Sequence, residues 1–563
     1  MTKRAIIHVE NTQGIVEFAR FLIDSGWTIL SANKTEEFLL KENIPVTKEL
    51  ALVENNLYVH DTSKLIRTII STKISEESDF LQESKPVDDI PIICMNLNPM
   101  YFKELSANQI SKYTKPYNFY VATVLRNAFV NYENLLILTD PADYQEAIIQ
   151  LRTNNVTPEF RTYLAAKALS LIAAYDAGIS ASILQNSPIS RNSFMNYLTL
   201  PYKKQYSFHN GSNSHQNACF YQLPTNSEAD KSFQKIQGKE LTYNIVSDVS
   251  FALNQMALVY SHLKNQFSVT CTNYEGYNFT TQFTPLTGAV FTIAIKYKAT
   301  LGAALSTNVV DSFKNTYSYD YENVKDATLC CSAVIDEEAA LEISKGNFIS
   351  VIAPGFTQEA KTIFAKNRDL RLFSTPKTDN EKFDFILANE GLLFQTNDNS
   401  PFNHWNVVTK TRPSQILIDQ MAFGVMLTMR TNSCSAALLK NHSIVGISHS
   451  ASSSTKAIRM VSEEAKDFFN RKNIAYSKEN NIADILASDS SISLTDELIE
   501  LIQNGLKAII QPGDLNNDNQ EFIDFCNSNP QALFFQSPYR IEIKEKNGWS
   551  GNILGVKEDG NII

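Results

Sequence analysis

Short apolar runs alternate with helical patterns over the first 150 residues of the chain. The apolar runs have strand length and stand at residues 5–9, 27–30, 90–95 and 134–139. Between the first two runs, the stretch from Gly14 to Leu22 repeats its apolar residues at helical spacing. Runs that are apolar throughout are typical of parallel strands buried on both faces. The pattern therefore predicts a doubly wound α/β domain over residues 1–150.

One long helix is predicted next, from Thr157 to Ile183. We expect this helix to form a connector over residues 151–200, which joins the first domain to the rest of the chain. The apolar residues of this helix recur at spacings of three and four and so share one face: Phe160, Leu164, Ala168, Leu171 and Tyr175.

The remaining residues, 201–563, again mix short apolar strands with helices. Residues 348–352 and 507–510 have the pattern of buried strands, and residues 414–427 have that of a helix. A chain of 563 residues is too long for one hydrophobic core, because single cores stop growing near about 250 to 300 residues. We therefore expect two subdomains here, with a boundary near residues 375–405. No internal repeat is recognisable by eye.

Composition and charge narrow the class of protein. Hydrophobic residues make up 43% and charged residues 20%, as in ordinary globular proteins. No apolar run approaches the roughly 18 residues of a membrane span, and residues 1–4 lead into a predicted strand without a secretory signal. The net charge of −10 opposes a general attraction to nucleic acid. We therefore expect a cytoplasmic protein that binds neither membranes nor nucleic acid.

The cysteines predict neither disulfides nor a metal site. All seven stand outside CxxC pairs and outside the Cys/His spacings typical of metal ligands. The adjacent Cys330 and Cys331 have the pattern of small buried residues.

Short motifs follow one another along nearly the whole chain in an order that resembles one enzyme family. They include N-L-N-P at 96–99, D-P-A-D-Y at 140–144, E-F-R at 159–161, G-K-E-L-T-Y-N at 238–244 and I-I-Q-P-G at 509–513. In this order they resemble the PurH family, whose members formylate AICAR and then close the ring to IMP. The resemblance implies a methylglyoxal-synthase-like doubly wound N-terminal domain and a larger α/β formyltransferase region with cytidine-deaminase-like subdomains. The matched pieces specify a fold rather than a chemistry.

The family's formyl-transfer positions carry other residues in this chain. Its V-K-H-T-N stretch reads V-T-C-T-N at 269–273, so Thr270 and Cys271 stand where the resemblance would place a catalytic Lys and His. The last residue of its K-S-N triplet is Cys434, and its G-Q-M-S-R loop reads S-A-S-S-S at 450–454. Positioned proton transfer is worth about 10² to 10⁴ in rate. The substitutions therefore predict a large loss of formyl transfer.

The family's ring-closing positions are substituted as well. The acid of its D-I-G-G-P-T motif corresponds to Asn118, and the lysine that follows in the same stretch corresponds to Val130. Its phosphate-binding S-T-G-G-T loop reads S-A-N-K-T at 31–35, without the glycines that let a ligand approach the backbone. The resemblance leaves these substrate-binding candidates: Ser31, Thr123, Arg126, Asn244 and Asn273.

The retained residues each have two interpretations. His215 is either an acid or base catalyst or a residue that only stabilises its loop. Asn244 and Asn273 either contact a ligand or cap turns, as Asn commonly does. Cys271 is either a nucleophile or an inert packed thiol, since the sequence offers no identifiable His partner for it.

Two hypotheses for the function follow. In the first, the chain keeps the PurH fold but has lost or strongly altered both activities, and it serves as a binding or regulatory partner. In the second, it is an active bifunctional enzyme that uses substituted residues and takes its formyl group from 10-formyltetrahydrofolate. The sequence favours the first, a pseudoenzyme, because the losses affect both sites. Whether the chain binds a purine nucleotide or a folate stays open.

Partners follow from the resemblance alone. Family members are homodimers whose sites lie at subunit boundaries. The resemblance therefore implies a homodimer, or a heterodimer of this chain with an active paralogue.

Overall fold

The computed structural model describes residues 3–47, 91–97, 119–185, 196–223, 233–264, 267–283, 288–375, 383–397, 404–411, 414–477, 479–512, 520–529 and 533–537. The chain forms two compact units, Met1–Ser207 with Cys219–Glu228, and Phe208–Ala218 with Ala229–Ile563. Both units mix helices with sheets, so the predicted α/β class is confirmed. The boundaries expected at 150, 200 and 375–405 stay predictions. So do the likenesses to methylglyoxal synthase and cytidine deaminase.

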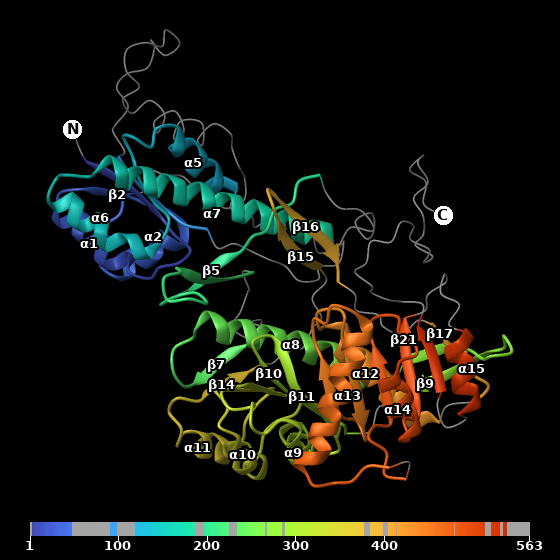
Figure 1. Ribbon diagram of the computed structural model, residues 1–563. Coiled ribbons are helices and arrows are strands. Elements are labelled where there is room, and N and C mark those ends of the chain that lie inside the picture. The colour runs from blue at the N-terminus through green and yellow to red at the C-terminus, as the bar shows by residue number, and fades with distance from the viewer. Residues whose placement is uncertain are drawn as a thin grey trace, which may run out of the picture. The chain divides into compact units, whose positions relative to one another are not determined.

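The first unit is built on a parallel sheet with the order β2-β1-β3-β4 (Figure 1). Each strand overlaps one of the predicted apolar runs, and β3 and β4 are buried along their whole length. The four strands are Thr28–Leu30 (β2), Arg4–His8 (β1), Ile92–Met95 (β3) and Leu136–Leu138 (β4).

Helices cover both faces of this sheet. On one face, α1 (Ile15–Asp24) and α6 (Tyr144–Arg152) pack with Ala5 and Ile7 of β1. On the other face, α5 (Phe119–Val130) and α7 (Pro158–Gln185) pack with Ile6, because successive strand residues point to opposite faces. The helix α2 spans Asn33–Lys41. The helix predicted over 157–183 is confirmed as α7.

Helix α7 is the one described helix that is long and apolar enough to cross a membrane, judged by length and composition over Pro158–Ala181. The sequence showed no uninterrupted apolar run there, so this result was not expected. Of that stretch, 44% is buried, and Ala165, Ala168 and Ile172 belong to the core of the first unit. The core helix of a globular unit passes the same test. Packing against the sheet therefore accounts for the apolar character of α7.

The D-P-A-D-Y motif attaches α7 to the rest of the first unit. Lys167 of α7 places its Nζ 2.8 Å from Asp140 Oδ2 and 2.7 Å from Asp143 Oδ2. Asp140 begins the short 3-10 helix η1 (Pro141–Asp143), and the buried Tyr144 stacks on Phe18 of α1. The motif therefore stabilises the fold through ion pairs and ring packing.

The second unit, shown in Figure 1, is built on a large sheet. Its strand order is β7-β14-β13-β12-β10-β11-β19-β18-β20-β21-β22-β17-β8-β9. The same arrangement occurs twice in it: a helix, an antiparallel hairpin, a second helix, and then three strands that alternate with helices. The two halves meet where β11 pairs with β19. Sequence reading found no repeat, whereas the structure shows one.

The elements of the two halves correspond one to one. The first half comprises α8 (Tyr243–Lys264), β10 (Val290–Lys296), β11 (Ala299–Ser306), α9 (Val309–Tyr319), β12 (Thr328–Cys331), α10 (Glu337–Ile343), β13 (Ser350–Ala353), α11 (Gln358–Phe364) and β14 (Arg371–Ser374). The second half comprises α12 (Gln415–Met429), β18 (Ala436–Lys440), β19 (Ser443–Ser448), α13 (Ser454–Arg471), β20 (Ile485–Ser488), α14 (Asp496–Gln503), β21 (Ala508–Pro512), α15 (Gln520–Ser528) and β22 (Leu533–Ser537).

The other strands extend the sheet or stand apart from it. The strand β7 (Gln234–Gln237) forms one edge, and β17 (His404–Val407), β8 (Phe267–Thr272) and β9 (Asn278–Phe283) form the other. Two further pairs make separate two-stranded sheets, namely β5 (Lys203–Phe208) with β6 (Ala218–Gln222), and β15 (Phe383–Ala388) with β16 (Gly391–Thr396). A short 3-10 helix η3 spans Ser344–Gly346.

The duplication extends to single residues. Each hairpin turns through two residues with positive φ, 297–298 in the first half and 441–442 in the second. The strand before each turn ends in a lysine that holds the loop before the third strand. Lys296 Nζ donates to the carbonyl of Lys325 at 2.7 Å, and Lys440 Nζ donates to the carbonyl of Asn481 at 2.5 Å.

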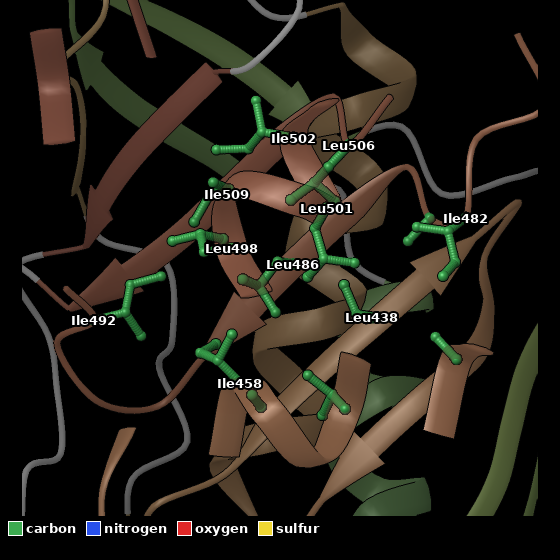
Figure 2. Packing of buried hydrophobic residues seen from close by; sticks show 14 of the residues in the cluster. Leu438, Ile458, Ile482, Leu486, Ile492, Leu498, Leu501, Ile502, Leu506 and Ile509 are labelled. Atoms are coloured by element: carbon green, nitrogen blue, oxygen red, sulfur yellow. The ribbon is translucent and has the colours of Figure 1, made fainter. Parts of the chain in front are cut away.

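Each half has an apolar core of its own. Figure 2 shows the core of the second half, in which Leu438 of β18 and Leu486 of β20 lie near Leu498 and Leu501 of α14. In the first half, the adjacent Cys330 and Cys331 of β12 are fully buried, which confirms that prediction.

Candidate functional site

Two segments that the resemblance assigns to formyl transfer, Cys434 and the loop 450–454, meet a third segment where strands of the large sheet end. Cys434 lies just before β18, and its backbone N–H donates to the carbonyl of Ala451 at 3.1 Å. In return, the N–H of Ala451 donates to the carbonyl of Cys434 at 3.0 Å. These bonds hold the loop 450–454 against Cys434. The third segment is the turn after β20, which begins at Asp489.

Asp489 joins this turn to the start of β18. Its Oδ1 accepts the backbone N–H of Ser435 at 2.8 Å, and its Oδ2 accepts the hydroxyl of Ser433 at 2.5 Å. The side chain is only 4% exposed. In the first half, Ser332 holds the equivalent position, where its Oγ accepts the N–H of Phe291 at 2.8 Å. The second half thus has a buried carboxylate where the first has a hydroxyl.

Two buried polar atoms near Asp489 lack a hydrogen-bond partner among the described residues. They are Ser490 Oγ and Gln511 Nε2. The other amide atom of Gln511, Oε1, accepts the N–H of Ile492 at 2.8 Å, so the side chain is fixed beside the same turn. Buried polar groups normally pair with protein or ordered water. These two atoms are therefore the groups that a bound molecule could engage at this edge.

Thr270 and Cys271 lie on the side of the sheet where β20 ends, as Asp489 does, but on a distant strand. They belong to β8, where they pair in parallel with His404 and Trp405 of β17. Between β18 and β8 the sheet takes five steps, through β20, β21, β22 and β17. At about 4.8 Å per step this separation is roughly 24 Å. The structure therefore does not bring Thr270 and Cys271 together with Cys434 in one catalytic group within a single chain.

The environment of Cys271 disfavours a nucleophile. Its side chain is fully buried, and this burial raises the pKa of the thiol to about 11. The reactive form of cysteine is the thiolate, which needs a lowered pKa. Thr270 is half-buried and carries no ionisable group. The environment agrees with an inert packed thiol at Cys271.

Asn273 caps the turn between β8 and β9. Its Oδ1 accepts the N–H of Glu275 at 3.1 Å and that of Tyr277 at 2.7 Å. These are the bonds of a turn cap, and a ligand contact of Asn273 stays a prediction. Asn244, at the start of α8, is exposed, and its Oδ1 accepts the hydroxyl of Ser212 at 3.3 Å. This bond ties α8 to the loop that contains His215.

His215 lies on that loop with an exposed side chain. The loop closes on itself, since Gly211 N–H donates to the carbonyl of Gln216 at 2.8 Å and Gln216 Oε1 accepts the N–H of Asn213 at 2.9 Å. Neither bond involves the His215 ring. Its two interpretations both remain predictions.

The ring-closing candidates lie in the first unit. Asn118 falls outside the described residues. Val130, at the end of α5, exposes 66% of its side chain, and Arg126, one turn earlier, forms an ion pair with Asp176 of α7. Thr123 is half-buried on the same helix.

Ser31 follows β2 at the carboxyl edge of the parallel sheet, where ligands of such sheets commonly bind. It is 1% exposed, and its Oγ has no hydrogen-bond partner among the described residues. The same segment continues into α2, where Thr35 is engaged in the fold. Thr35 Oγ1 accepts the N–H of Val9 and donates to the carbonyl of Val9, both at 3.0 Å.

No group of three or more His, Cys, Asp or Glu side chains that could hold a metal ion occurs among the described residues. All seven cysteines are free thiols. Sequence reading singled out neither Asp489 nor Ser433, although an acid directly after a buried strand is a recognisable signal of a strand-end site.

Comparisons with known proteins agree with the motif order. The family model described as AICARFT/IMPCHase bienzyme matches residues 128–464. The chain is similar to the bifunctional purine biosynthesis protein PurH of Clostridium acetobutylicum, with 28% identity over 533 residues, covering 94% of this chain and 97% of that protein. It is likewise similar to the PurH proteins of Brachyspira hyodysenteriae and Fusobacterium nucleatum, each 26% identical, covering 95% of this chain and 98% of the relative. A crystal structure of ForH matches 32% of the chain and 98% of its own, with 21% identity and a TM-score of 0.27.

Proposed function

Because this chain belongs to the AICARFT/IMPCHase bienzyme family, we propose that it keeps the bienzyme's fold but has lost, or strongly altered, both formyl transfer and ring closure. Its ancestry is that of a bifunctional enzyme of purine biosynthesis. In this proposal it acts as a binding or regulatory partner in the cytoplasm.

The state of Cys271 carries the proposal. Formyl transfer to a weakly nucleophilic amine needs a base in the correct protonation state near the reacting nitrogen. The position that the resemblance gives to a histidine holds a fully buried thiol with a pKa raised to about 11. Such a group is protonated at neutral pH and is sealed from substrate. Neighbouring Thr270 supplies no charge.

The ring-closing site supports the same conclusion. The lysine position holds Val130, whose apolar side chain is 66% exposed and has no means of donating a proton. The nearby cation of Arg126 is engaged by Asp176. Loss at both sites is more economical to explain by one change of role than by two separate replacements of catalytic machinery.

The alternative is an active bifunctional enzyme that uses substituted residues and 10-formyltetrahydrofolate. One observation favours it, namely the buried carboxylate of Asp489 beside the atoms of Ser490 and Gln511 that have no hydrogen-bond partner within the described ranges. Both oxygens of this carboxylate, however, already accept hydrogen bonds from the protein itself, from Ser435 and Ser433.

Separate assays of the two steps test the proposal. Purified chain is given AICAR and 10-formyltetrahydrofolate in one assay and formyl-AICAR in the other. We expect turnover at background in both. A matched variant, Thr270→Lys with Cys271→His, restores the family pair and serves as the comparison. Turnover by the unmodified chain well above background in either step would overturn the proposal for that step.

We also propose that the chain forms a homodimer, or pairs with an active paralogue. The separation of roughly 24 Å between β18 and β8, estimated from strand spacing, supports this proposal. A site that needs both segments is completed more simply by two chains than by one. The molar mass in solution, measured by light scattering, tests the homodimer, and a monomer at micromolar concentration would contradict it.

A further inference from the structure

Few backbone hydrogen bonds join the two halves of the large sheet. The strands β11 and β19 pair at Ala304 and Ser443, and the N–H of Leu305 donates to the carbonyl of His442 at 3.0 Å. Beyond this point the described strands run on without further pairing to each other. We call this contact the seam. Within each half, by contrast, the hairpin strands pair along most of their length.

Side chains take the place of the missing backbone bonds at the seam. The N–H of Ile447 in β19 donates to Tyr319 Oη at 3.2 Å and to Glu464 Oε2 at 3.3 Å. The hydroxyl of Tyr319 in turn donates to Glu464. Further along, His449 Nε2 donates to the carbonyl of Thr300 in β11 at 3.0 Å. Tyr319 and Thr300 come from the first half, and their partners come from the second.

The helices on this face meet through polar groups and through one ring contact, in which Tyr319 of α9 lies against Phe468 of α13 with the ring centroids 6.0 Å apart. Arg471 of α13 donates to the backbone carbonyl of Tyr319 at 2.8 Å and lies 3.4 Å from Asp320. Lys472 Nζ donates to Ser318 Oγ at 3.2 Å. The apolar cores beneath α9 and α13 are separate clusters. Elsewhere the halves meet through apolar groups, where Phe291 of β10 packs edge-on against Phe423 of α12 at 5.8 Å.

The seam is held by hydrogen bonds on one face and by an apolar contact on the other, and this difference allows the two halves to rotate against each other. Apolar contacts are non-directional and tolerate small rotations, whereas hydrogen bonds weaken steeply when their angle changes. Rotation of one half against the other would therefore keep the Phe291–Phe423 contact and break the bonds of Tyr319 and His449. The polar side determines the angle between the halves.

We propose that the seam is a joint between the two halves, and that Glu464 and His449 are positioning residues that lock it in the orientation required by the loop 450–454. His449 directly precedes this loop, and Ala451 within it pairs with Cys434 of the candidate site. The bond to Thr300 thus connects the first half to a site made by the second. This inference goes beyond the proposed function and does not depend on catalysis.

The electrostatics agree with this geometry. Burial lowers the pKa of His449, although its bond to the Thr300 carbonyl opposes the shift, so the ring is neutral and donates from Nε2. Burial raises the pKa of Glu464, against the hydrogen bonds from Tyr319 and Ile447. Asp320 adds to that rise and Arg471 opposes it.

Hydrogen exchange of the full chain, followed by mass spectrometry, tests the proposal. In Tyr319→Phe, which removes only the hydroxyl, we expect exchange in peptides covering 443–449 to rise about five- to tenfold, because one hydrogen bond is worth roughly 1 kcal/mol. Strands β12 and β13, within the first half, should exchange as before. Tyr317→Phe is the matched control, since Tyr317 lies on the same helix and its ring packs on Phe313 and Phe348.

A second pair of variants tests His449 without removing the tyrosine. In His449→Ala, exchange in the loop 450–454 should rise several-fold, and in His449→Gln the side-chain amide should restore part of the protection. Glu464→Gln, which keeps an acceptor oxygen, should change exchange less than Glu464→Ala. Equal exchange in Tyr319→Phe and Tyr317→Phe would refute the joint. So would a rise spread evenly over β12, β13 and the seam, which would indicate general loss of stability.

Discussion

Gly302 of β11 and Gly446 of β19 hold equivalent positions in the two halves, and each lies against the backbone of the helix that follows its strand. A Cβ on Gly302 would stand 2.4 Å from the carbonyl oxygen of Thr316, and one on Gly446 would stand 2.5 Å from that of Val461. Real Cβ atoms do not approach a backbone so closely. Neither glycine has a positive φ, so both are required for space rather than for backbone conformation.

Alanine at either position should destabilise the second unit. The helix would have to move away from its strand, at a cost of about 1–3 kcal/mol in the free energy of unfolding, as for other overpacked sites. Urea unfolding of Gly302→Ala and Gly446→Ala, followed by circular dichroism, measures this cost. Gly391→Ala is the control, because a Cβ there meets no atom within 4 Å. An equal effect in all three variants would contradict the argument from space.

Cys271 should resist alkylation in the folded protein. Its thiol is fully buried and its pKa is raised to about 11, so little thiolate forms between pH 7 and 9. Cys219, half-buried on the short β5–β6 sheet, is the internal control and should react first. Iodoacetamide labelling with peptide mass spectrometry gives both rates. Labelling of Cys271 as fast as that of Cys219 at neutral pH would show an accessible thiol and weaken the proposed loss of function.

The first unit could be predicted from sequence because its information is local. Its parallel strands are short runs of apolar residues, and the helix expected over 157–183 is observed at Pro158–Gln185. Such patterns follow directly from which faces are buried. Pairing among these strands then leaves few alternatives.

The large sheet could not be predicted in the same way because its order depends on contacts distant in sequence. The two halves share little beyond their turns, the lysines before those turns, the close-packed glycines and the Pro-Gly pairs at 354–355 and 512–513. Asp489 was missed for a similar reason. Its role depends on the N–H of Ser435, 54 residues earlier, and nothing local to Asp489 reveals that partner.

The candidate site could be predicted in part. The motif positions assigned Cys434 and the loop 450–454 to the same activity, and the structure places the two side by side. The sequence could not show that Thr270 and Cys271 lie five strands away in the same chain. Their separation is a property of strand order, which residue types near the motif do not determine.

The second half should lose stability in acid through Asp484. Lys507 Nζ lies 2.6 Å from its Oδ1, which also accepts the side-chain amide of Asn481 at 2.9 Å, and its Oδ2 accepts the N–H of Asn441 at 3.0 Å. Burial opposes ionisation of this carboxyl, but these hydrogen bonds outweigh burial and hold its pKa below the ordinary value. A lowered pKa gives stability that is present above the unfolded pKa of about 3.9 and is lost as pH falls through the folded pKa.

Asp484→Asn should therefore cost about 1–3 kcal/mol at pH 7 and flatten the fall in stability below about pH 4. Urea unfolding at a series of pH values gives both quantities. Asp369→Asn removes an exposed pair with Lys239 and should cost less than about 0.5 kcal/mol. If the acid sensitivity of Asp484→Asn matched that of the unmodified chain, another carboxylate would have to account for it.

In the first unit, the ion pairs of Lys167 should make stability depend on pH. Lys167→Met would leave Asp143, which is 7% exposed, without its counter-ion. Burial already raises the pKa of Asp143 against the opposing effect of Lys167, and loss of the lysine should raise it further. A raised pKa makes the folded state bind a proton more tightly. The resulting loss in the free energy of unfolding is largest above the folded pKa and disappears as pH falls below the unfolded pKa.

We expect a loss of about 1–3 kcal/mol at pH 7 that shrinks toward pH 4. Thermal unfolding across this range measures the trend, with Lys204→Met on the exposed strand β5 as control. A loss independent of pH would mean that Lys167 acts through its contact with the Tyr163 ring rather than through its ion pairs with Asp140 and Asp143.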